Sequence, residues 1–188
     1  MNLPNKLTIL RIVLIPVFVA LLMVKGIPHN YLLAALVFVI ASLTDLLDGK
    51  IARKNGIVTD FGKLMDPLAD KMLVTSAIVV FLALGLTGPV EVIIILSRDL
   101  LITSIRLLAA SKGEVLAAGM FGKVKTASQM AAIITVMVVK EVEYLGVIPF
   151  ISSNANTISV VLMWITSILT LASGIDYVVK YKKYFSCK

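Results

Sequence analysis

The chain has 188 residues, of which 59% are hydrophobic and 15% charged, and its mean hydropathy is +1.00. Soluble domains carry about 25% charged residues, so this composition argues against a soluble protein and favours an integral membrane protein. The formal net charge is +7. Because the basic residues lie between apolar stretches, this charge indicates membrane topology and argues against a nucleic-acid partner. Cys187 is the only cysteine, which excludes an intrachain disulfide and a thiolate metal site.

Six stretches have the length and the apolar character of membrane-spanning helices, which need roughly 20 residues each. We expect these spans at about 7–24, 31–48, 64–86, 90–110, 125–145 and 157–179. Turn-prone connections at 25–30, 85–89 and 146–156 alternate with longer basic ones at 50–63 and 111–125. The first stretch lacks a convincing cleavage site, so we expect it to remain in the protein. The sequence therefore predicts an all-α integral membrane protein with six transmembrane helices, in which residues 1–188 form one domain.

The basic residues are distributed asymmetrically over the connections. Connections on one side, with the C-terminal tail, hold Lys50, Arg53, Lys54, Lys63, Lys112, Lys123, Lys125, Lys180, Lys182, Lys183 and Lys188. The other side has only Lys25 and Lys140, the latter beside two glutamates. Since cytoplasmic loops are enriched in Lys and Arg, we expect a multi-pass protein of the cell membrane with both termini in the cytoplasm. The single histidine, His29, then lies on the outer side, away from any cytoplasmic site.

Four aspartates stand at the edge of two apolar stretches, within DLLDGKIARKNGIVTDFGKLMDPLADK (45–71). Asp45 and Asp48 are three residues apart, and Asp66 and Asp70 are four apart, so each pair shares one helix face. Any one of them alone could be a solvated charge or a helix cap. Four carboxylates brought together would repel one another unless cations neutralise them, and oxygen ligands suit Mg²⁺, Mn²⁺ or Ca²⁺. The spacing does not fit an EF-hand, whose ligands alternate along a loop.

The residues around the aspartates indicate what such metals would hold. Gly49 lets a ligand approach the backbone, and the planar fork of Arg53 can clamp a phosphate. Thr8 and Arg11, near the start of the first span, can enter the same pocket. Metals, carboxylates and an arginine together indicate phosphoryl-transfer chemistry, and no ATP-binding glycine loop is present. Without a nearby histidine, Asp70 is the best-placed base.

The spacing Asp45-x2-Asp48-Gly49-x2-Ala52-Arg53-x8-Gly62-x3-Asp66-x3-Asp70 closely resembles the signature of the CDP-alcohol phosphatidyltransferase family. The segments NLPNKLTILRIVLIPVF, SRDLLITSIR (97–106) and GKVKTASQ (122–129) are similar to the phosphatidylglycerophosphate synthase branch of that family. The resemblance covers most of the chain, and its later motifs are less specific than the aspartate pattern.

The resemblance implies a homodimer of six-helix subunits, each with a cytoplasm-facing cavity and two divalent cations, Mg²⁺ or Mn²⁺. It implies transfer of a phosphatidyl group from CDP-diacylglycerol to an alcohol, with release of CMP. Carried over by position, the four aspartates would bind the metals and Asp70 would deprotonate the acceptor. Gly49, Ala52 and Arg53 would hold the CDP group, and we add Thr8, Arg11 and Gly62 to this CDP-lipid site.

For the acceptor we expect glycerol 3-phosphate, because Arg106, Lys112, Lys123 and Lys125 cluster around the second basic connection. The tripeptide Phe-Gly-Lys occurs before the third span and again before the fifth, and helix N-termini attract phosphate. We therefore expect the donor phosphates near Gly62 and the acceptor phosphate near Gly122. Arg98 and Asp99 lie nearer to the middle of their span, and we expect both to pair with polar groups inside the bundle.

Three alternatives remain open on the sequence alone. Within the family, inositol phosphate or serine could be the acceptor. Membrane prenyltransferases also use aspartate motifs with Mg²⁺, although their motifs usually lie much further apart than the 17 residues between these two pairs. A divalent-cation transporter would also carry carboxylates, but its path should continue across the membrane, where this sequence has few acidic residues.

Overall fold

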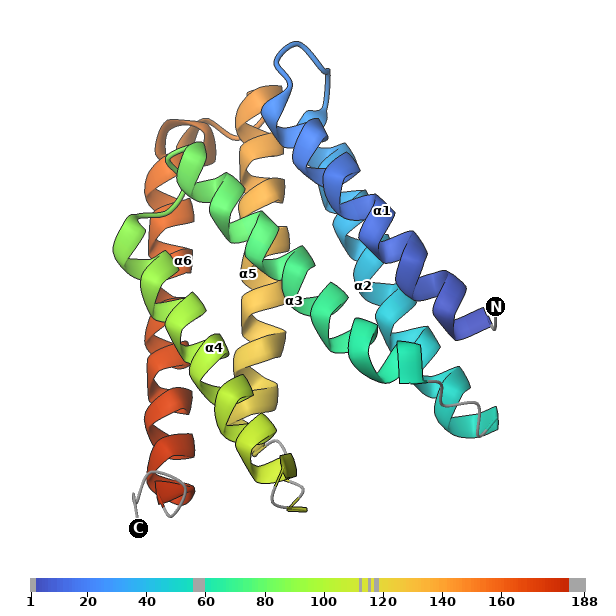
Figure 1. Cartoon of the computed structure of the whole chain (residues 1–188). Helices are drawn as coiled ribbons and strands as arrows, with labels where there is room; N and C mark the ends of the chain where they lie inside the picture. The colour runs from blue at the N-terminus through green and yellow to red at the C-terminus, as the bar shows by residue number, and fades with distance from the viewer. Residues whose placement is uncertain (1–2, 56–59, 112, 115, 117–118, 183–188) are drawn as a thin grey trace.

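A computed structural model describes residues 3–55, 60–111, 113–114, 116 and 119–182 of the chain. Within these ranges, the side chains of 3–5, 45–55, 60–64, 66–67 and 70 are not described. The described residues form six α-helices and no strand, which confirms the all-α fold (Figure 1). The helices are α1 (Leu3–Met23), α2 (Asn30–Asn55), α3 (Asp60–Ala83), α4 (Pro89–Ser111), α5 (Met120–Leu145) and α6 (Pro149–Lys180).

Each predicted span corresponds to one helix, although the predicted spans 7–24 and 64–86 run past the ends of α1 at Met23 and α3 at Ala83. Three predicted connections are too long: α5 already begins at Met120, within the segment 111–125, and the other two differences are larger. The segment 50–63 is largely helical, because α2 continues to Asn55 and α3 begins at Asp60. The segment 146–156 is mostly the first part of α6, which has Pro149 in its first turn, where the fixed φ of proline suits a helix. Ser153 Oγ donates to the carbonyl of Pro149 at 2.8 Å, so this polar side chain is satisfied without leaving the helix.

The helices form two groups that diverge from one end of the molecule (Figure 1). In the first group, α1 packs against both α2 and α3; in the second, α6 packs against α5 and α4. Contacts between α2 and α5 join the groups. We call the end with the connections 24–29, 84–88 and 146–148 the closed end. The opposite end, where α2, α4 and α6 finish and α1, α3 and α5 begin, is the open end.

One apolar cluster contains buried residues of all six helices. Aromatic side chains fill part of it, such as Phe18 and Phe38, whose ring centroids lie 5.8 Å apart. Several of its helix contacts are made by alanines that are almost fully buried, including Ala34, Ala41 and Ala77. Small residues allow helix backbones to approach closely, which is how helices associate in a membrane where apolar burial gives little driving force.

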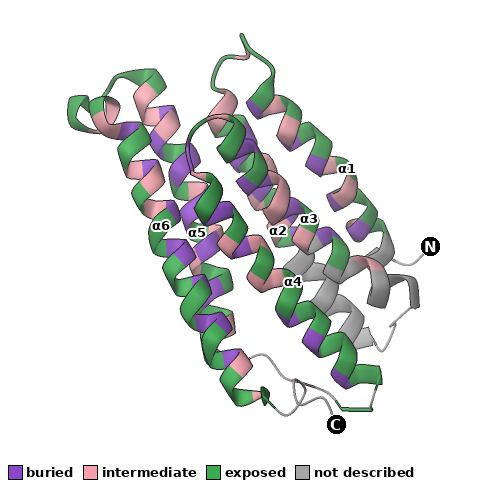
Figure 2. Cartoon of the chain, turned by 60° about the vertical axis from the view of Figure 1, so that its left-hand side comes forward, coloured by how far each residue is buried: buried purple, intermediate pink, exposed green. Residues whose placement is uncertain are grey.

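The outer faces of the helices carry many exposed large hydrophobic side chains, whereas the buried residues face the interior (Figure 2). Large exposed apolar patches of this kind are typical of surfaces that contact membrane lipids or another protein. By length and composition, two described helices can cross a membrane, α1 over Lys6–Met23 and α6 over Pro149–Lys180. Shorter apolar stretches occupy Asn30–Thr44 of α2 and Lys71–Ala83 of α3.

Hydrogen bonds and ion pairs of polar side chains connect the helices at the closed end. Glu141 of α5 is buried; its Oε1 lies 2.5 Å from His29 Nδ1, and its Oε2 accepts the backbone N–H of Leu32 at 3.2 Å. Leu32 lies in the first turn of α2, where backbone N–H groups have no partner within the helix and a negative charge is favourable. Lys140 forms an ion pair with Glu143 and donates to Asn156 of α6 at 3.1 Å. These contacts tie α5 to the start of α2 and to α6.

Candidate functional site

The four aspartates of the sequence motif lie on the two helices that meet at the open end. Asp45 and Asp48 are on α2, and Asp66 and Asp70 are on α3. Since both segments are helical, residues three or four apart share a face, and α2 and α3 pack against each other. The side chains of all four lie outside the described residues. The backbone thus supports the predicted pairing within each helix, and the ligand role of the carboxylates stays a prediction.

The residues predicted for the CDP-lipid all belong to the first group of helices. Thr8 and Arg11 lie on α1 and are fully buried, and α1 packs against both helices of the motif. Gly49, Ala52 and Arg53 lie in the last turns of α2, and Gly62 lies in the first turn of α3, with side chains outside the described part. A fully buried arginine requires anionic or polar neighbours, which agrees with its predicted place beside a polar site.

A cavity of about 790 Å³ lies between α3, α4, α5 and α6. Apolar side chains, among them Val74, Ile102 and Met130, form part of its wall, and Gly119 and Gly122 at the start of α5 form another part. Its polar lining consists of Lys71, Arg98, Asp99, Thr103, Arg106, Lys123, Lys125, Thr126, Gln129 and Tyr177. A hollow of this size accommodates a small polar ligand.

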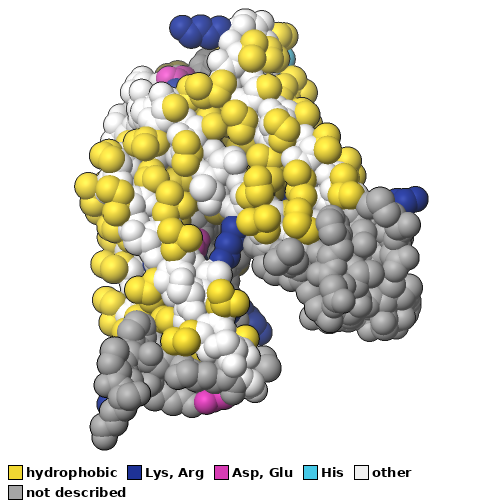
Figure 3. All heavy atoms as spheres, viewed as in Figure 1, with side chains coloured by type: hydrophobic (Ala, Val, Ile, Leu, Met, Phe, Trp, Pro, Cys, Tyr) yellow, Lys and Arg dark blue, Asp and Glu magenta, His cyan; other side chains and the backbone are white. Residues whose placement is uncertain are grey.

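The described lining of this cavity is strongly cationic. Five of its side chains carry a positive charge and one, Asp99, a negative charge. In the space-filling view, Lys and Arg side chains line the hollow between the two groups of helices (Figure 3). A concave surface with one sign of charge and low-dielectric walls concentrates ions of the opposite sign. The cavity is therefore built to receive an anion.

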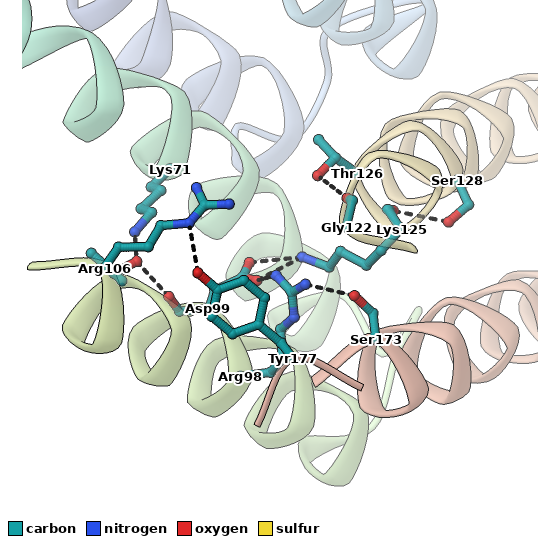
Figure 4. A network of polar contacts seen from close by, with 11 residues as sticks. Lys71, Arg98, Asp99, Arg106, Gly122, Lys125, Thr126, Ser128, Ser173 and Tyr177 are labelled. Carbon is teal, nitrogen blue, oxygen red and sulfur yellow. Dashed lines mark hydrogen bonds and ion pairs between the residues drawn. The ribbon is translucent and has the colours of Figure 1, made fainter. Parts of the chain in front are cut away.

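A buried ion-pair network joins α4, α5 and α6 at the cavity wall (Figure 4). The ammonium group of Lys125, whose side chain is only 4% exposed, lies 2.7 and 2.9 Å from the two carboxylate oxygens of Asp99. Arg98 Nη1 also contacts Asp99 Oδ1 at 3.0 Å, and Arg98 Nη2 donates to Ser173 Oγ at 2.7 Å. The prediction that Arg98 and Asp99 pair inside the bundle is confirmed.

Arg106, one of the predicted acceptor-binding residues, lies beside Tyr177 of α6. Its Nε donates to Tyr177 Oη at 3.4 Å, and its guanidinium carbon lies 5.8 Å from the centre of the ring. Tyr177 is itself nearly buried. Beside Arg106, Lys71 of α3 donates to Thr103 Oγ1 of α4 (Figure 4). The aromatic ring fixes the position of Arg106 while some of its N–H donors remain available to a ligand.

The N-terminus of α5 opens onto the same cavity. Gly119 precedes the helix and has no side chain that could cap it, and no described side chain caps the start of α5. The N–H of Gly122 is bonded to the carbonyl of Gly119 at 3.1 Å, so the groups open to a ligand are those of the first residues of the helix. Gly119 and Gly122 both line the cavity. Unsatisfied N–H groups at a helix start, together with the positive end of its dipole, favour a bound phosphate. This geometry agrees with the expectation of an acceptor phosphate near Gly122.

Three of the four residues predicted for the acceptor phosphate, Arg106, Lys123 and Lys125, line this one cavity. The fourth, Lys112, lies outside the described residues. Sequence reasoning missed Lys71, Gln129 and Tyr177, which also line the cavity. Lys71 directly follows Asp70, and Gln129 ends the quoted GKVKTASQ segment, so their places in these motifs could have identified them as site residues. Tyr177 lies in none of the quoted motifs, so the sequence did not point to it.

A second, apolar groove of about 450 Å³ runs along the surface between α4 and α6. Its walls include Ile94, Leu101 and Ile175, and Arg98 lines both this groove and the cationic cavity. A methyl group at Gly174 would lie 2.9 Å from Arg98 Cγ, closer than side-chain atoms approach. The absence of a side chain at position 174 therefore allows Arg98 to pass between α4 and α6 to the cavity.

Comparison with known proteins gives one consistent result. The profile of the CDP-alcohol phosphatidyltransferase family matches residues 1–172. Relatives named CDP-diacylglycerol–glycerol-3-phosphate 3-phosphatidyltransferase are similar over nearly the full length. The Bacillus subtilis protein is 38% identical, covering 94% of this chain and 93% of its own. Those of Rickettsia bellii and Haemophilus influenzae are both 36% identical, covering 98% and 94% of this chain and 97% and 91% of their own.

Proposed function

The chain belongs to the CDP-alcohol phosphatidyltransferase family, and from this premise we propose that it transfers the phosphatidyl group of CDP-diacylglycerol to glycerol 3-phosphate, releasing CMP. The names of the relatives support this activity. The observation that carries the choice of acceptor is the cationic cavity. It adjoins α3 at Lys71, the residue that follows the motif residue Asp70.

We assign the acceptor phosphate to Arg106, Lys123 and Lys125, with the open N-terminus of α5 beside them. Lys112 belongs to the same proposal. A doubly charged phosphate needs more than one cation, and hydrogen bonds between charged groups are about twice as strong as neutral ones. Serine carries no phosphate and would leave these cations unused, so the cavity favours a phosphorylated acceptor. The more bulky inositol phosphate remains a competitor that turnover measurements must exclude.

The CDP-lipid would lie against the first group of helices, at Thr8, Arg11, Gly49, Ala52, Arg53 and Gly62. Asp70 would accept the proton of the acceptor hydroxyl. The hydroxyl oxygen would then form a bond to the lipid-side phosphorus while the bond from that phosphorus to the bridging oxygen breaks, and CMP leaves with the electron pair. Acceptor and donor would thus meet at α3, which contributes to both sites.

We propose that Asp45, Asp48, Asp66 and Asp70 hold two divalent cations, Mg²⁺ or Mn²⁺. An all-carboxylate donor set from two packed helices fits such hard ions. When bound, the cations would supply charge stabilisation for the diphosphate and the departing CMP. Among the side chains that the structure describes, no other group of three or more acidic, histidine or cysteine residues is placed to hold a metal.

We also propose that all six helices cross the cell membrane, with both termini and the cavity on the cytoplasmic side, that residues 1–188 form one domain, and that the enzyme is a homodimer. The exposed apolar faces of the helices support the membrane placement. Charged residues inside α4 interrupt its apolar character, and the structure places Arg98 and Asp99 in an internal network, where membrane proteins keep such residues.

The decisive experiment is turnover of the purified protein in detergent or vesicles with CDP-diacylglycerol and a panel of acceptors, followed by CMP release. We expect turnover with glycerol 3-phosphate, and much less with inositol phosphate or serine. A chelator should abolish it, and added Mg²⁺ or Mn²⁺ should restore it. Faster turnover with serine than with glycerol 3-phosphate would contradict the proposed acceptor.

A further inference from the structure

Gln129 of α5 is a buried polar residue in the wall of the cationic cavity. It lies four residues after Lys125, so both side chains are on one face of the helix. Gln129 is 2% exposed, and it lines the cavity together with Lys123 and Lys125. Its side-chain amide nitrogen is buried and has no hydrogen-bond partner among the described residues.

Some other buried polar side chains of the bundle have a hydrogen-bond partner within their own helix. Ser159 Oγ donates to the carbonyl of Ala155 at 2.8 Å, and Ser167 Oγ donates to the carbonyl of Met163 at 2.9 Å. Arg98 and Lys125 both pair with Asp99, although Arg98 Nε has no described partner. Thr170 Oγ1 on α6 also has none, but Thr170 does not line the cavity, whereas Gln129 does. A buried N–H group without a partner loses its hydration and gains nothing in return, and such groups are rare in folded proteins. Because Gln129 lines the cavity, a molecule bound there can supply the partner that its amide lacks.

The surroundings limit where that partner can be. Part of the cavity wall consists of the apolar side chains of Val74, Ile102 and Met130, which offer no acceptor. Asp99, Thr103, Thr126 and Tyr177 also line the cavity, but among the described contacts none of their oxygens accepts from Gln129. A ligand in the cavity is the partner that this arrangement leaves room for. Measured along α5 at 1.5 Å per residue, Gln129 lies about 9 Å further from the helix start than Lys123 and about 6 Å further than Lys125. It thus faces the part of a ligand that is remote from a phosphate held at the start of α5.

We propose that Gln129 determines acceptor specificity by binding the hydroxyl group that does not react, the one on the central carbon of a three-carbon phosphate. The inference rests on the proposed function and deepens it. A carboxamide has both a donor and an acceptor, so it pairs with a hydroxyl group in either orientation. The anionic end of the acceptor is held by the cations, and Gln129 recognises the polyol end. A site that hydrogen-bonds a substrate hydroxyl group discriminates against an analogue that lacks it.

The test compares two acceptors and two residues. The acceptors are glycerol 3-phosphate and 3-hydroxypropyl phosphate, which lacks only the central hydroxyl group. We expect the wild-type protein to prefer glycerol 3-phosphate about two- to tenfold in kcat/KM, the range expected for one hydrogen bond. In Gln129→Leu, and in the similarly shaped Gln129→Met, the two acceptors should have nearly equal kcat/KM. Met137→Leu, an apolar change on the same helix in the buried apolar cluster and outside the cavity lining, should keep the wild-type preference.

The possible results distinguish a failure of the proposed role of Gln129 from a failure of the proposed function. Equal use of both acceptors by the wild-type protein would overturn the role of Gln129 without any variant, while leaving the proposed function intact. The role is also overturned if either Gln129 variant retains the wild-type preference, since a water molecule or a merely structural amide would give that result. If the wild-type protein uses neither acceptor but turns over another alcohol, the proposed function itself fails.

Discussion

The two ends of this helix bundle use charge in opposite ways. At the closed end, Glu141 is shared between His29 and the N–H of Leu32, and Lys140 is paired with Glu143. Opposite charges there are matched and hold helices together. Toward the open end, the described lining of a cavity of about 790 Å³ includes five cations and one carboxylate. The positive charge there exceeds the negative charge of the described side chains, and such an excess is typical of a site that binds an anion.

One helix, α5, contributes charged residues to both ends, so the two ends can be compared within the same helix. Its last turns carry Glu141 and its first turns carry Lys123 and Lys125. The difference therefore does not come from helix composition or from burial alone, since Glu141 and Lys125 are both buried. It comes from what the neighbouring helices supply. We expect substitutions at the closed end to change stability and those at the open end to change catalysis.

The largest effect should come from the motif aspartates. Asp45→Asn, Asp48→Asn, Asp66→Asn and Asp70→Asn each replace an anionic ligand by a neutral amide, so each should lower turnover at least about 100-fold. The measurement is CMP release by purified variants at saturating CDP-diacylglycerol and glycerol 3-phosphate. Asp60→Asn, in the same stretch but outside the pattern, is the control and should stay near wild type. Near-normal turnover in any two of the four would refute the four-aspartate site.

Lys125→Met should have the next largest effect, because this residue takes part in both structure and binding. The change removes a cation from the cavity, and of the described ion pairs of Asp99 it leaves the one with Arg98. We expect the KM for glycerol 3-phosphate to rise about tenfold or more, and the unfolding free energy in detergent to fall by about 1–3 kcal/mol. Adding Asp99→Asn should recover part of the stability, because it removes the carboxylate that lost its partner, and should not recover the KM. Recovery of both would show that Lys125 is structural only.

At the closed end, Glu141→Ala should lower the unfolding free energy by about 1–3 kcal/mol, because it removes a buried carboxylate that accepts the N–H of Leu32 in the first turn of α2. The value of kcat/KM should remain within about twofold of wild type at a temperature where the variant stays folded. Glu143→Ala, two residues away, loses only a partly exposed ion pair and should change stability by less than about 1 kcal/mol. A kinetic defect in folded Glu141→Ala would break the division between the two ends.

The smallest change should be that of Tyr177→Phe. It removes a long hydrogen bond of 3.4 Å to Arg106 Nε but keeps the ring against the guanidinium group. We expect the KM for glycerol 3-phosphate to shift by no more than about threefold. Tyr177→Ala also removes the ring and should raise that KM clearly more. Equal effects of the two variants would mean that the hydroxyl group, and not the ring, positions Arg106.

The sequence predicted what depends on neighbours along the chain, and it missed what depends on packing. Long apolar stretches and turn residues gave the six helices, and the spacing of Asp45 to Asp70 gave the candidate metal site. The helical extension of α2 to Asn55 was missed because a polar helix that protrudes beyond the apolar stretch resembles a loop by hydropathy.

Contacts between segments that are distant in the chain could not be predicted from the sequence either. Lys125 and Asp99 are 26 residues apart, and Arg106 and Tyr177 are 71 apart. Each pair meets only because α4, α5 and α6 pack as they do. The position of Asp99 within an apolar stretch predicts a polar partner, since an unpaired carboxylate there would be unfavourable, but nothing in the sequence identifies Lys125 as that partner.

The contact between Gly174 and Arg98 has a consequence for how this chain can evolve. A methyl group on residue 174 would collide with the arginine, while shortening the arginine first would leave Ser173 and Asp99 without their bonds to it. Neither position can change alone without loss, so the two should vary together among relatives or not at all. We therefore expect positions 98 and 174 to be evolutionarily coupled, although they lie 76 positions apart in the chain.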